Sequence, residues 1–237
     1  MYSHRSSTGP VDLAFTDRHG GVSAAPFDSL NLALVGEDDA GARRRNLELV
    51  LEDFAPGARL AEMDQVHGRR VVTTTGEEAR ERCDALVTDR PDVVLVVRVA
   101  DCVPVLLADP DAGVVGAAHA GRQGVLEGVV TACVDQMRAL GADRVHAWVG
   151  PHVCGGCYEV PEAMREEVAR VEPTTATTTS WGTPGLDLGA GVRAQLERAG
   201  VVVDDVSRCT LESPDLYSHR RDGISAGRSA GLVRRRG

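Results

Sequence analysis

Apolar residues in the middle of the chain are arranged in two short runs that flank a turn. Val103–Ala108 and Val114–Ala118 are apolar and partly β-branched, and the residues between them read Asp-Pro-Asp-Ala-Gly. Runs of this length around such a turn predict a β-hairpin. Folding at the turn places Cys102, just before the first strand, beside His119, just after the second, because cross-strand neighbours lie within about 8 Å.

The pattern predicts further strands and helices along the rest of the chain. A continuous apolar run over Val93–Val99 indicates a strand that is buried on both faces. Apolar residues at helical spacing predict helices over residues 41–54, 121–141, 161–171 and 186–199. Shorter strands are expected within residues 11–35 and over 71–74, 85–87, 145–149 and 201–206, and the threonine-rich residues 174–179 are expected to form an exposed loop.

No repeat or linker interrupts this pattern, so we expect one domain over residues 1–237, with flexible ends at 1–10 and 234–237. A hydrophobic content of 43% and a charged content of 26% are typical of a soluble globular protein. Aromatic residues make up only 3%, so Val, Leu and Ala must fill the core. The sequence shows no long apolar span and no basic-then-apolar leader. We therefore expect no membrane partner and a cytoplasmic location.

The charge balance limits the partners and the chemistry. A net charge of −9 argues against a nucleic-acid partner, since a nucleic-acid binder needs a basic surface. The chain contains no lysine, which excludes Schiff-base chemistry, pyridoxal-phosphate enzymes and a P-loop. A bound anion must therefore be held by arginine, by backbone N–H groups or by a metal. In the cytoplasm, the six cysteines are expected to be thiols or ligands rather than disulfides.

Cys102 and His119, with His67 of the segment Gln-Val-His-Gly, are candidate metal ligands. One Cys and two His provide three ligands, and a fourth, open position is typical of catalytic zinc. The spacing does not determine whether His67 approaches the other two. Two alternatives stay open for Cys102: a small buried hydrophobic side chain, or a Cys–His dyad for nucleophilic catalysis. The carboxylate of the adjacent Asp101 favours a functional site, because it has no role in packing.

The segment Cys154-Gly155-Gly156-Cys157 suggests two further hypotheses. A zinc ribbon would need a second such pair, and the chain has none. A redox-active dithiol normally begins a helix after a strand, and the preceding residues 150–152 fit that only loosely. Zinc nucleobase deaminases share a Pro-Cys-x-x-Cys half-motif but are excluded, because the chain has no His-x-Glu. We expect this Gly-rich loop to bring backbone N–H groups and Cys157 to a pocket wall.

Arginines within turn-like segments are candidate phosphate ligands. Arg18 precedes His-Gly-Gly, Arg45 precedes Asn46, and Arg221 precedes Asp-Gly. An ordered loop can hold a guanidinium in position to bind phosphate through two parallel hydrogen bonds.

Motifs along nearly the whole chain, from about Phe15 to Val233, resemble the YfiH family, also called the polyphenol-oxidase or laccase-domain family. Several motifs in this order make the resemblance specific. They are FT-x-R-x-GGVS at 15–23, SLNL at 29–32, QVHG at 65–68, ADCVPVLLAD at 100–109, HAG at 119–121, GP-x-x-x-x-x-CYEV at 150–160 and RRDG at 220–223.

The resemblance implies an α/β (α+β) fold in which mixed β-sheets are sandwiched between helices, similar to the cytotoxic necrotizing factor deamidases. It implies a metal, usually zinc, bound by His67, Cys102 and His119. It also implies purine nucleoside phosphorylase activity on adenosine, inosine and methylthioadenosine, with adenosine deaminase activity. Other members of the family are polyphenol oxidases, and one branch is a cytoplasmic peptidoglycan-editing factor.

We favour the zinc-dependent phosphorylase, a monomer or weak homodimer whose substrates are a purine nucleoside and phosphate. Asp101 and Cys102 are the expected catalytic residues, with Asp101 handling protons while zinc activates water or phosphate. The expected substrate-binding residues are Arg18, Asn31, Arg45, Gln65, Cys157 and Arg221.

Three alternatives to the phosphorylase remain. One is a hydrolase that edits nucleotide-linked peptidoglycan precursors, and another is a copper-dependent polyphenol oxidase, since Cu²⁺ outcompetes zinc for such ligands. A multicopper laccase would need more imidazoles than the seven histidines present, and His-x-His pairs that the chain lacks. The third alternative, a non-catalytic protein with a structural metal, would need a fourth protein ligand.

Two motifs depart from the family pattern. The family's HAGWRG is His119-Ala120-Gly121-Arg122-Gln123-Gly124 here, so an aromatic surface is lost and the guanidinium moves by one position. The paired cysteines often found before Tyr-Glu-Val become Gly156-Cys157. These changes put the choice of substrate in question.

Overall fold

Strands β8 (Val103–Asp109) and β9 (Val114–Ala120) form the predicted hairpin at the centre of the computed structural model, which describes residues 1–237. The antiparallel register places Pro104 opposite His119 near the open end of the hairpin. Every residue of both strands is buried, because their sheet is covered on both faces. The hairpin prediction is confirmed.

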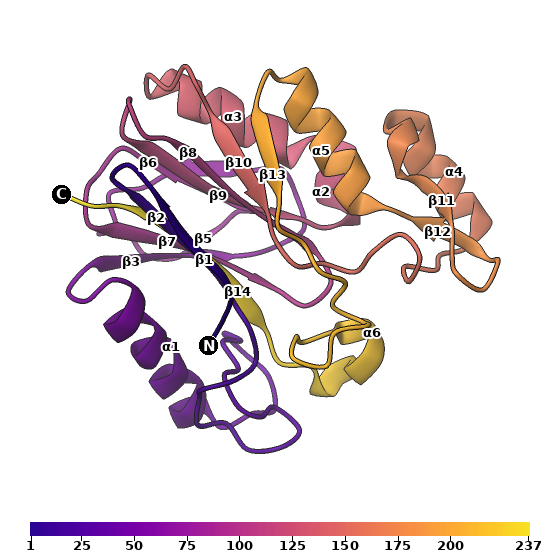
Figure 1. Cartoon of the computed structure of the whole chain (residues 1–237), viewed down its shortest axis with the longest axis horizontal. Helices are drawn as coiled ribbons and strands as arrows, with labels where there is room; N and C mark the ends of the chain where they lie inside the picture. Colours follow the sequence, from indigo (N-terminus) through magenta and orange to yellow (C-terminus); the bar gives the residue numbers. More distant parts are fainter.

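Two six-stranded sheets lie face to face (Figure 1). The first has the order β1 (Tyr2–Thr8), β2 (Val11–Thr16), β14 (Ser229–Arg235), β7 (Val93–Val99), β3 (Arg59–Asp64) and β5 (Glu81–Arg82). The second has the order β13 (Val202–Asp205), β10 (His146–Val149), β8, β9, β6 (Ala85–Thr88) and β4 (Val71–Thr73). Both sheets combine parallel and antiparallel pairs. In the first, β7 is parallel to β3 and antiparallel to β14. In the second, β10 is parallel to β13 and antiparallel to β8.

Helices cover the outer faces of the two sheets. Figure 1 shows α1 (Ala40–Phe54) on the side of the first sheet, and α2 (Arg122–Glu127), α3 (Val129–Ala139) and α5 (Leu188–Arg198) on the side of the second. The remaining helices are α4 (Glu162–Val171), the short α6 (His219–Asp222) and the 3-10 turns at Pro173–Thr175 and Gly223–Ser225. This helix–sheet–sheet–helix order confirms the expected sandwich. None of the helices combines the length and hydrophobicity that crossing a bilayer requires.

The layered arrangement explains the continuous apolar runs of the central strands. In β8, Leu106 packs in the core between the two sheets, whereas Leu107 packs in the core under the helices of the second sheet. In β7, Leu95 enters the core between the sheets and Val96 the core under α1. A strand that is buried on both faces has no solvent-facing positions, so its apolar side chains need not alternate with polar ones.

The helix predicted over residues 121–141 is divided at Gly128, which corrects that prediction. Gly128 has a φ of 76°, in the left-handed region, where α2 ends and α3 begins. Glycine adopts this conformation at no steric cost because it has no Cβ. The apolar stripe continues through both helices, so hydrophobic spacing alone did not reveal the break.

Residues 174–179 do not form the expected loop. They contain β11 (Ala176–Thr178), which pairs with β12 (Pro184–Leu186) in a small antiparallel sheet. Threonine is β-branched and favours strands, so its polarity misled the prediction.

The two ends of the chain, expected to be flexible, are strands of the first sheet. β1 pairs with β2, and β14 lies between β2 and β7. The carboxylate of Asp12 on β2 forms ion pairs with Arg234 and Arg236 near the end of β14. Strand pairing, together with these ion pairs at the end of β14, therefore gives both ends of the chain a regular structure.

Candidate metal centre and its two cavities

The open end of the hairpin carries two of the three predicted ligands. His119 lies on β9, and Cys102 immediately precedes β8. His67 comes from the loop that follows β3. The potential ligand atoms of these three residues all lie within 4.8 Å of one another, and the two imidazole rings meet edge to face with centroids 4.8 Å apart. The structure thus brings together side chains from two separate segments of the chain.

Asp84, which directly precedes β6, holds the loop that carries His67. Its buried carboxylate accepts hydrogen bonds from the backbone N–H groups of Val66, His67 and Gly68, at 3.2, 2.9 and 2.7 Å. These bonds stabilise the positive φ of 63° at His67. Sequence analysis missed Asp84, although an acidic residue directly before a buried apolar strand was a usable signal.

The same carboxylate orients His119. Nδ1 of His119 donates a hydrogen bond to Oδ1 of Asp84 at 2.8 Å, which leaves Nε2 available to a metal. A carboxylate in this position fixes the ring and the tautomer of a ligating histidine and makes it a stronger ligand. Burial raises the pKa of Asp84, but hydrogen bonds from His119 and from the backbone outweigh burial and lower the pKa overall.

Without a bound metal, Cys102 and His119 have pKa shifts of opposite direction. Burial raises the pKa of the Cys102 thiol, but hydrogen bonds and charge from His119 and His67 outweigh it and lower the pKa to about 6. Burial lowers the pKa of His119, but hydrogen bonds to Asp84 and Cys102 raise it to about 9. A thiolate therefore faces an imidazolium at neutral pH. A Cys–His dyad needs only one histidine, so the presence of both favours metal binding.

The backbone around the triad is shaped to let the three side chains meet. A Cβ atom at Gly121 would lie 2.8 Å from Cδ2 of His67 and 3.2 Å from Sγ of Cys102, so only glycine allows this approach. The cluster contains no fourth His, Cys or carboxylate ligand. One thiolate and two imidazoles suit zinc or copper, and a three-ligand set is typical of catalytic zinc.

Two cavities meet at the triad. The larger has a volume of about 420 Å³ and is bordered by all three triad residues, and the smaller has a volume of about 290 Å³. Ala100, Cys102 and His219 line both. The smaller cavity is otherwise lined by Asp101, Arg122, Val153, Tyr158, Leu188 and Arg220. Two cavities that share the thiol of Cys102 suit a reaction between two substrates.

Asp101 and Gln65 line these cavities, but both are engaged within the protein. The side-chain amide of Gln65 donates to the carbonyl oxygen of Arg98 and accepts from its N–H, each at 2.8 Å. One carboxylate oxygen of Asp101 accepts from the hydroxyl of Thr210 at 2.6 Å, and the other accepts from the backbone N–H of Arg220 at 2.7 Å. Asp101 therefore helps to position the loop before Cys102, and proton transfer by its carboxylate stays a prediction.

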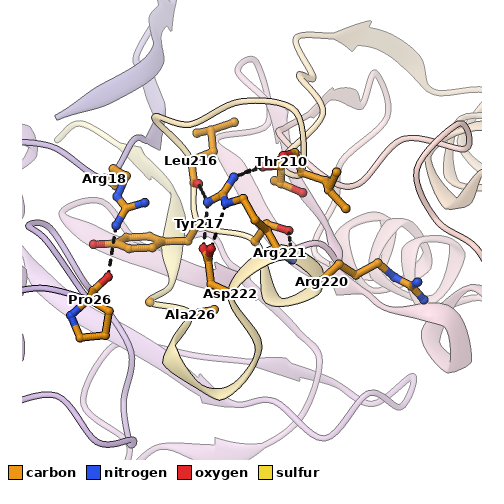
Figure 2. Close-up of polar contacts among 12 residues, drawn as sticks. Arg18, Pro26, Thr210, Leu216, Tyr217, Arg220, Arg221, Asp222 and Ala226 are labelled. Carbon is orange, nitrogen blue, oxygen red and sulfur yellow. Dashed lines mark hydrogen bonds and ion pairs between the residues drawn. The ribbon is translucent and has the colours of Figure 1, made fainter.

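Arg221, a predicted phosphate ligand, is used inside its own loop. Its guanidinium donates to the carbonyl oxygens of Thr210 and Leu216, at 3.0 and 2.7 Å, and forms an ion pair with Asp222 (Figure 2). It lines neither cavity at the triad. The turn-like context that suggested anion binding instead reflects the hydrogen bonds that build the turn.

Arg18 also has a structural role. Its guanidinium donates to the carbonyl oxygens of Asp28 and Pro26, at 2.7 and 3.2 Å, and lies over the ring of Tyr217 with 4.8 Å to the ring centroid (Figure 2). Arg18 lines neither of the two cavities. Two of its guanidinium nitrogens, Nε and Nη2, therefore serve the loop that precedes α1.

Arg45 and Asn31 line neither cavity, although Asn31 bonds the backbone of Arg228, which lines the larger one. Arg45 is exposed on α1, where it forms ion pairs with Glu48 and Glu52. Asn31 is buried, and its amide bonds the carboxylate of Asp38 and the backbone N–H of Arg228. Arg45 was expected to bind phosphate, but on the exposed face of α1 its guanidinium pairs with acidic side chains one or two turns away.

Cys157 is buried behind the smaller cavity and does not line it. Its neighbours are Cys154, Cys209 and Glu212, whose potential ligand atoms lie within 4.8 Å of one another and of its own Sγ. Cys157 instead lines a further cavity that shares Arg220 with the smaller one, and its contact with substrate stays a prediction.

The arginines that line the smaller cavity escaped sequence analysis as phosphate ligands. Arg220 lies over the ring of Tyr158, 4.2 Å from the centroid, and its side chain extends away from that of Arg221 (Figure 2). Arg122 is the first residue of α2, in the motif that departs from the family pattern. The choice between Arg220 and the adjacent Arg221 depends on side-chain direction on the short helix α6, which adjacency in sequence does not define.

Comparison with known proteins agrees with the fold and the motifs. The sequence matches the family model described as multi-copper polyphenol oxidoreductase laccase over residues 12–236. The chain belongs to this family. Solved structures of similar fold include a Neisseria meningitidis protein of the family DUF152, with a TM-score of 0.88, 31% identity and 99% of both chains covered. Another is YfiH from Bacillus licheniformis, with a TM-score of 0.87, 29% identity, and 95% of this chain and 93% of that chain covered. The resemblance to YfiH proteins is thereby confirmed.

Curated relatives within the family carry the name of one activity. A purine nucleoside phosphorylase of Streptomyces coelicolor is 50% identical to this chain, with 98% of this chain and 99% of the relative covered. A purine nucleoside phosphorylase of Mycobacterium tuberculosis is 46% identical, with 97% and 95% covered. These relatives support an enzyme whose substrates are small molecules.

Proposed function

We propose that this protein is a zinc-dependent purine nucleoside phosphorylase that acts on adenosine, inosine and methylthioadenosine in the cytoplasm. The observation that carries the proposal is the meeting of two cavities at the triad of His67, Cys102 and His119. Phosphorolysis needs a phosphate to approach C1′ of the bound nucleoside from the side opposite the purine, so it needs two adjoining spaces. The names of relatives at 50% and 51% identity support the same reaction.

The triad has the composition and shape that a catalytic zinc needs. His67, Cys102 and His119 would bind the ion, with Asp84 fixing the ring of His119. Bound zinc would supply a Lewis acid that polarises an oxygen of a reactant. The copper-dependent polyphenol oxidase explains less of the site, because a neutral phenol gives the arginines of the smaller cavity no partner.

The volumes and linings of the two cavities assign one to each substrate. The larger cavity, of about 420 Å³, is lined by apolar residues such as Met63 and Val99 and by polar and charged ones that include three arginines, and its size would suit the nucleoside. Phosphate would bind in the smaller cavity between Arg122 and Arg220, since guanidinium groups bind phosphate in a bidentate manner. Leu188 on the same wall would help to exclude water.

The chain's own side chains can supply the remaining needs of the reaction. A phosphate oxygen forms a bond to C1′ as the C1′–N9 bond breaks, and the electron pair of that bond stays on the purine. The purine then takes up a proton. His219, which lines both cavities, is the group placed to give it. Deamination of adenosine would instead need C6 of the purine at the triad, so adenosine would have to bind in the reverse orientation.

An assay of the zinc-loaded protein on each nucleoside, with and without phosphate, tests the proposal. We expect free purine base and ribose 1-phosphate to form only when phosphate is present, and Cys102→Ala to abolish both products. Cys133→Ala, which changes a cysteine buried under α3, is the matched control and should keep full activity.

Further assays distinguish the phosphorylase from the alternative functions. Turnover of a phenol by the copper-loaded protein, or hydrolysis of a nucleotide-linked peptidoglycan precursor, in each case without phosphorolysis of any nucleoside, would replace the proposal. Release of inosine and ammonia from adenosine, independent of phosphate, would establish the deaminase reaction.

A further inference from the structure

A second group of potential metal ligands lies behind the smaller cavity. Sγ atoms of Cys154, Cys157 and Cys209 and a carboxylate oxygen of Glu212 all lie within 4.8 Å of one another. None of the three thiols forms a disulfide. The first two come from the loop after β10, and the other two from the segment after β13. The tertiary structure thus supplies the two ligands that a search for a second Cys-x-x-Cys pair could not find.

The Cys154–Cys157 loop has the tight backbone turn that such a site requires. The N–H groups of Cys157 and Tyr158 both donate to the carbonyl oxygen of Cys154, at 3.0 Å each. A Cβ atom at Gly155 would lie 2.8 Å from Cβ of Asp187, and one at Gly156 would lie 2.9 Å from Oγ of Ser180. Glycine at both positions therefore lets the turn pack closely while its two thiols point to the same side.

Backbone contacts hold the third cysteine against this turn. Residues His152 and Cys209 form an isolated β-bridge, and the N–H of Thr210 donates to the carbonyl oxygen of His152 at 3.0 Å. The backbone N–H of Cys154 approaches Sγ of Cys209 at 3.5 Å and donates to it. The main chain thus places Cys209 against the Cys154–Cys157 loop, and the N–H of Cys154 holds its sulfur on the side that faces this loop.

The ligand number distinguishes this cluster from the triad. Zinc bound to three thiolates and one carboxylate in a tetrahedron places the four ligand atoms about 3.6–3.8 Å apart. Movements of about 1 Å or less would bring the four atoms from their present spacing to that geometry, and the exposed side chain of Glu212 is free to make them. Four protein ligands close the coordination sphere, which is typical of a structural metal.

We propose that Cys154, Cys157, Cys209 and Glu212 bind a second zinc ion, which is structural. The ion ties the loop after β10 to the segment after β13. Both of these segments hold Asp101: the N–H of Val153 donates to its carbonyl oxygen at 3.1 Å, and the hydroxyl of Thr210 donates to its carboxylate at 2.6 Å. Through Asp101, the second ion stabilises the backbone that carries Cys102 and one wall of the smaller cavity.

Zinc counting on the intact protein tests this second site independently of any catalytic assay. We expect two zinc ions per chain by elemental analysis and native mass spectrometry. Cys157→Ser and Cys209→Ser should each retain one ion, and Cys102→Ser should also retain one, because it empties only the triad. Cys133→Ala should retain two. Cys157→Ser should also lower the melting temperature more than Cys102→Ser does.

Two measurements keep the test decisive if a cysteine variant fails to fold. Glu212→Gln changes an exposed side chain and should release one of the two ions to a chelator faster than the unchanged protein does. Cobalt-substituted Cys102→Ala, which lacks the triad thiolate, should still show thiolate-to-cobalt charge-transfer absorption. A single zinc per chain that Cys102→Ser removes, or a Cys154–Cys157 disulfide found by mass spectrometry of the alkylated protein, would overturn the proposal.

Discussion

The buried carboxylate of Asp84 accepts a hydrogen bond from Nδ1 of His119 at 2.8 Å. The same carboxylate binds the backbone N–H of His67 at 2.9 Å. One side chain therefore positions two of the three metal ligands, although the ligands come from different segments. The geometry of the metal centre depends on Asp84 even though Asp84 is not itself a ligand.

Asp84→Asn is expected to weaken zinc binding at the triad by about 10- to 100-fold, the usual cost of losing such a carboxylate behind a ligand. The amide cannot accept from His119 and from the loop N–H groups as the carboxylate does. Competition with a chromophoric chelator measures the affinity, and the Cys157→Ser background restricts the measurement to the triad. The exposed Asp89→Asn is the control. An unchanged zinc affinity in Asp84→Asn would show that packing alone orients His119.

Cys102 is expected to be the cysteine that alkylating reagents modify first in the zinc-free protein. Its pKa is lowered to about 6, so the reactive thiolate forms as the pH rises through 6 and is nearly complete at pH 7.5. Burial raises the pKa of Cys133 to about 12, so this thiol should stay unmodified. Mass spectrometry after brief treatment with iodoacetamide at pH 5 to 8 measures the profile. Zinc should protect Cys102, and an equal rate at pH 5 and pH 7.5 would contradict the lowered pKa.

Asp109→Ala is expected to lower the free energy of unfolding by about 3 kcal/mol, because four backbone N–H groups lose the buried carboxylate that accepts from them. The carboxylate accepts from the N–H groups of Asp111 and Ala112 in the hairpin turn, and from those of Asp143 and Arg144 before β10. Urea denaturation at pH 7 measures the change. The exposed Asp111→Ala, which loses one surface ion pair, should change stability by less than about 1 kcal/mol.

The contribution of Asp109 should also depend on pH. Burial raises the pKa of this carboxyl, but the backbone hydrogen bonds outweigh burial and lower the pKa below the ordinary value of 3.8. A lowered pKa in the folded state means that the stabilisation is complete above pH 3.8 and is lost as the pH falls below it. The difference in stability between the unchanged protein and Asp109→Ala should therefore shrink below that pH. A constant difference down to pH 2.5 would contradict this.

Arg220→Gln is expected to raise the KM for phosphate by about 10-fold or more and to leave the KM for the nucleoside nearly unchanged. A charge-assisted hydrogen bond is worth about 1.5–3 kcal/mol, and the backbone N–H that holds Asp101 remains in the variant. Arg45→Gln, on the outer face of α1, should change neither constant. Steady-state kinetics with each substrate varied in turn measure the KM for phosphate and the KM for the nucleoside separately. A rise confined to the KM for the nucleoside would reverse the assignment of the cavities.

Local patterns predicted most of the central elements. The helix over 41–54 begins one residue earlier in the structure, and the strand at 93–99 has the predicted bounds. The failures at the chain ends and at residues 174–179 share a cause: each element depends on pairing with a strand that the local pattern does not contain. β1 and β14 form because they pair with β2 and β7, and the threonines of β11 form a strand because they face β12.

In the metal centre, too, some contacts follow from the local sequence and others depend on tertiary structure. The hairpin determines that Cys102 lies beside His119, since a short turn leaves the two strands one register. By contrast, the loop of His67 is held beside His119 by hydrogen bonds to Asp84. Asp84 lies 35 residues before His119 in the chain. The sequence did not reveal that Arg18, Arg45 and Arg221 bond within the protein, because it does not show which partners each guanidinium meets.

By itself, the sequence determined the family motifs, the strands of the hairpin and the identity of the Cys and His side chains that can bind a metal. Only the tertiary structure decided that His67 completes the triad and that Cys209 and Glu212 join Cys154 and Cys157. The physical reason is the range of the interactions. Periodicity and turn chemistry act between residues a few positions apart, whereas each ligand cluster requires segments at the ends of different strands to meet.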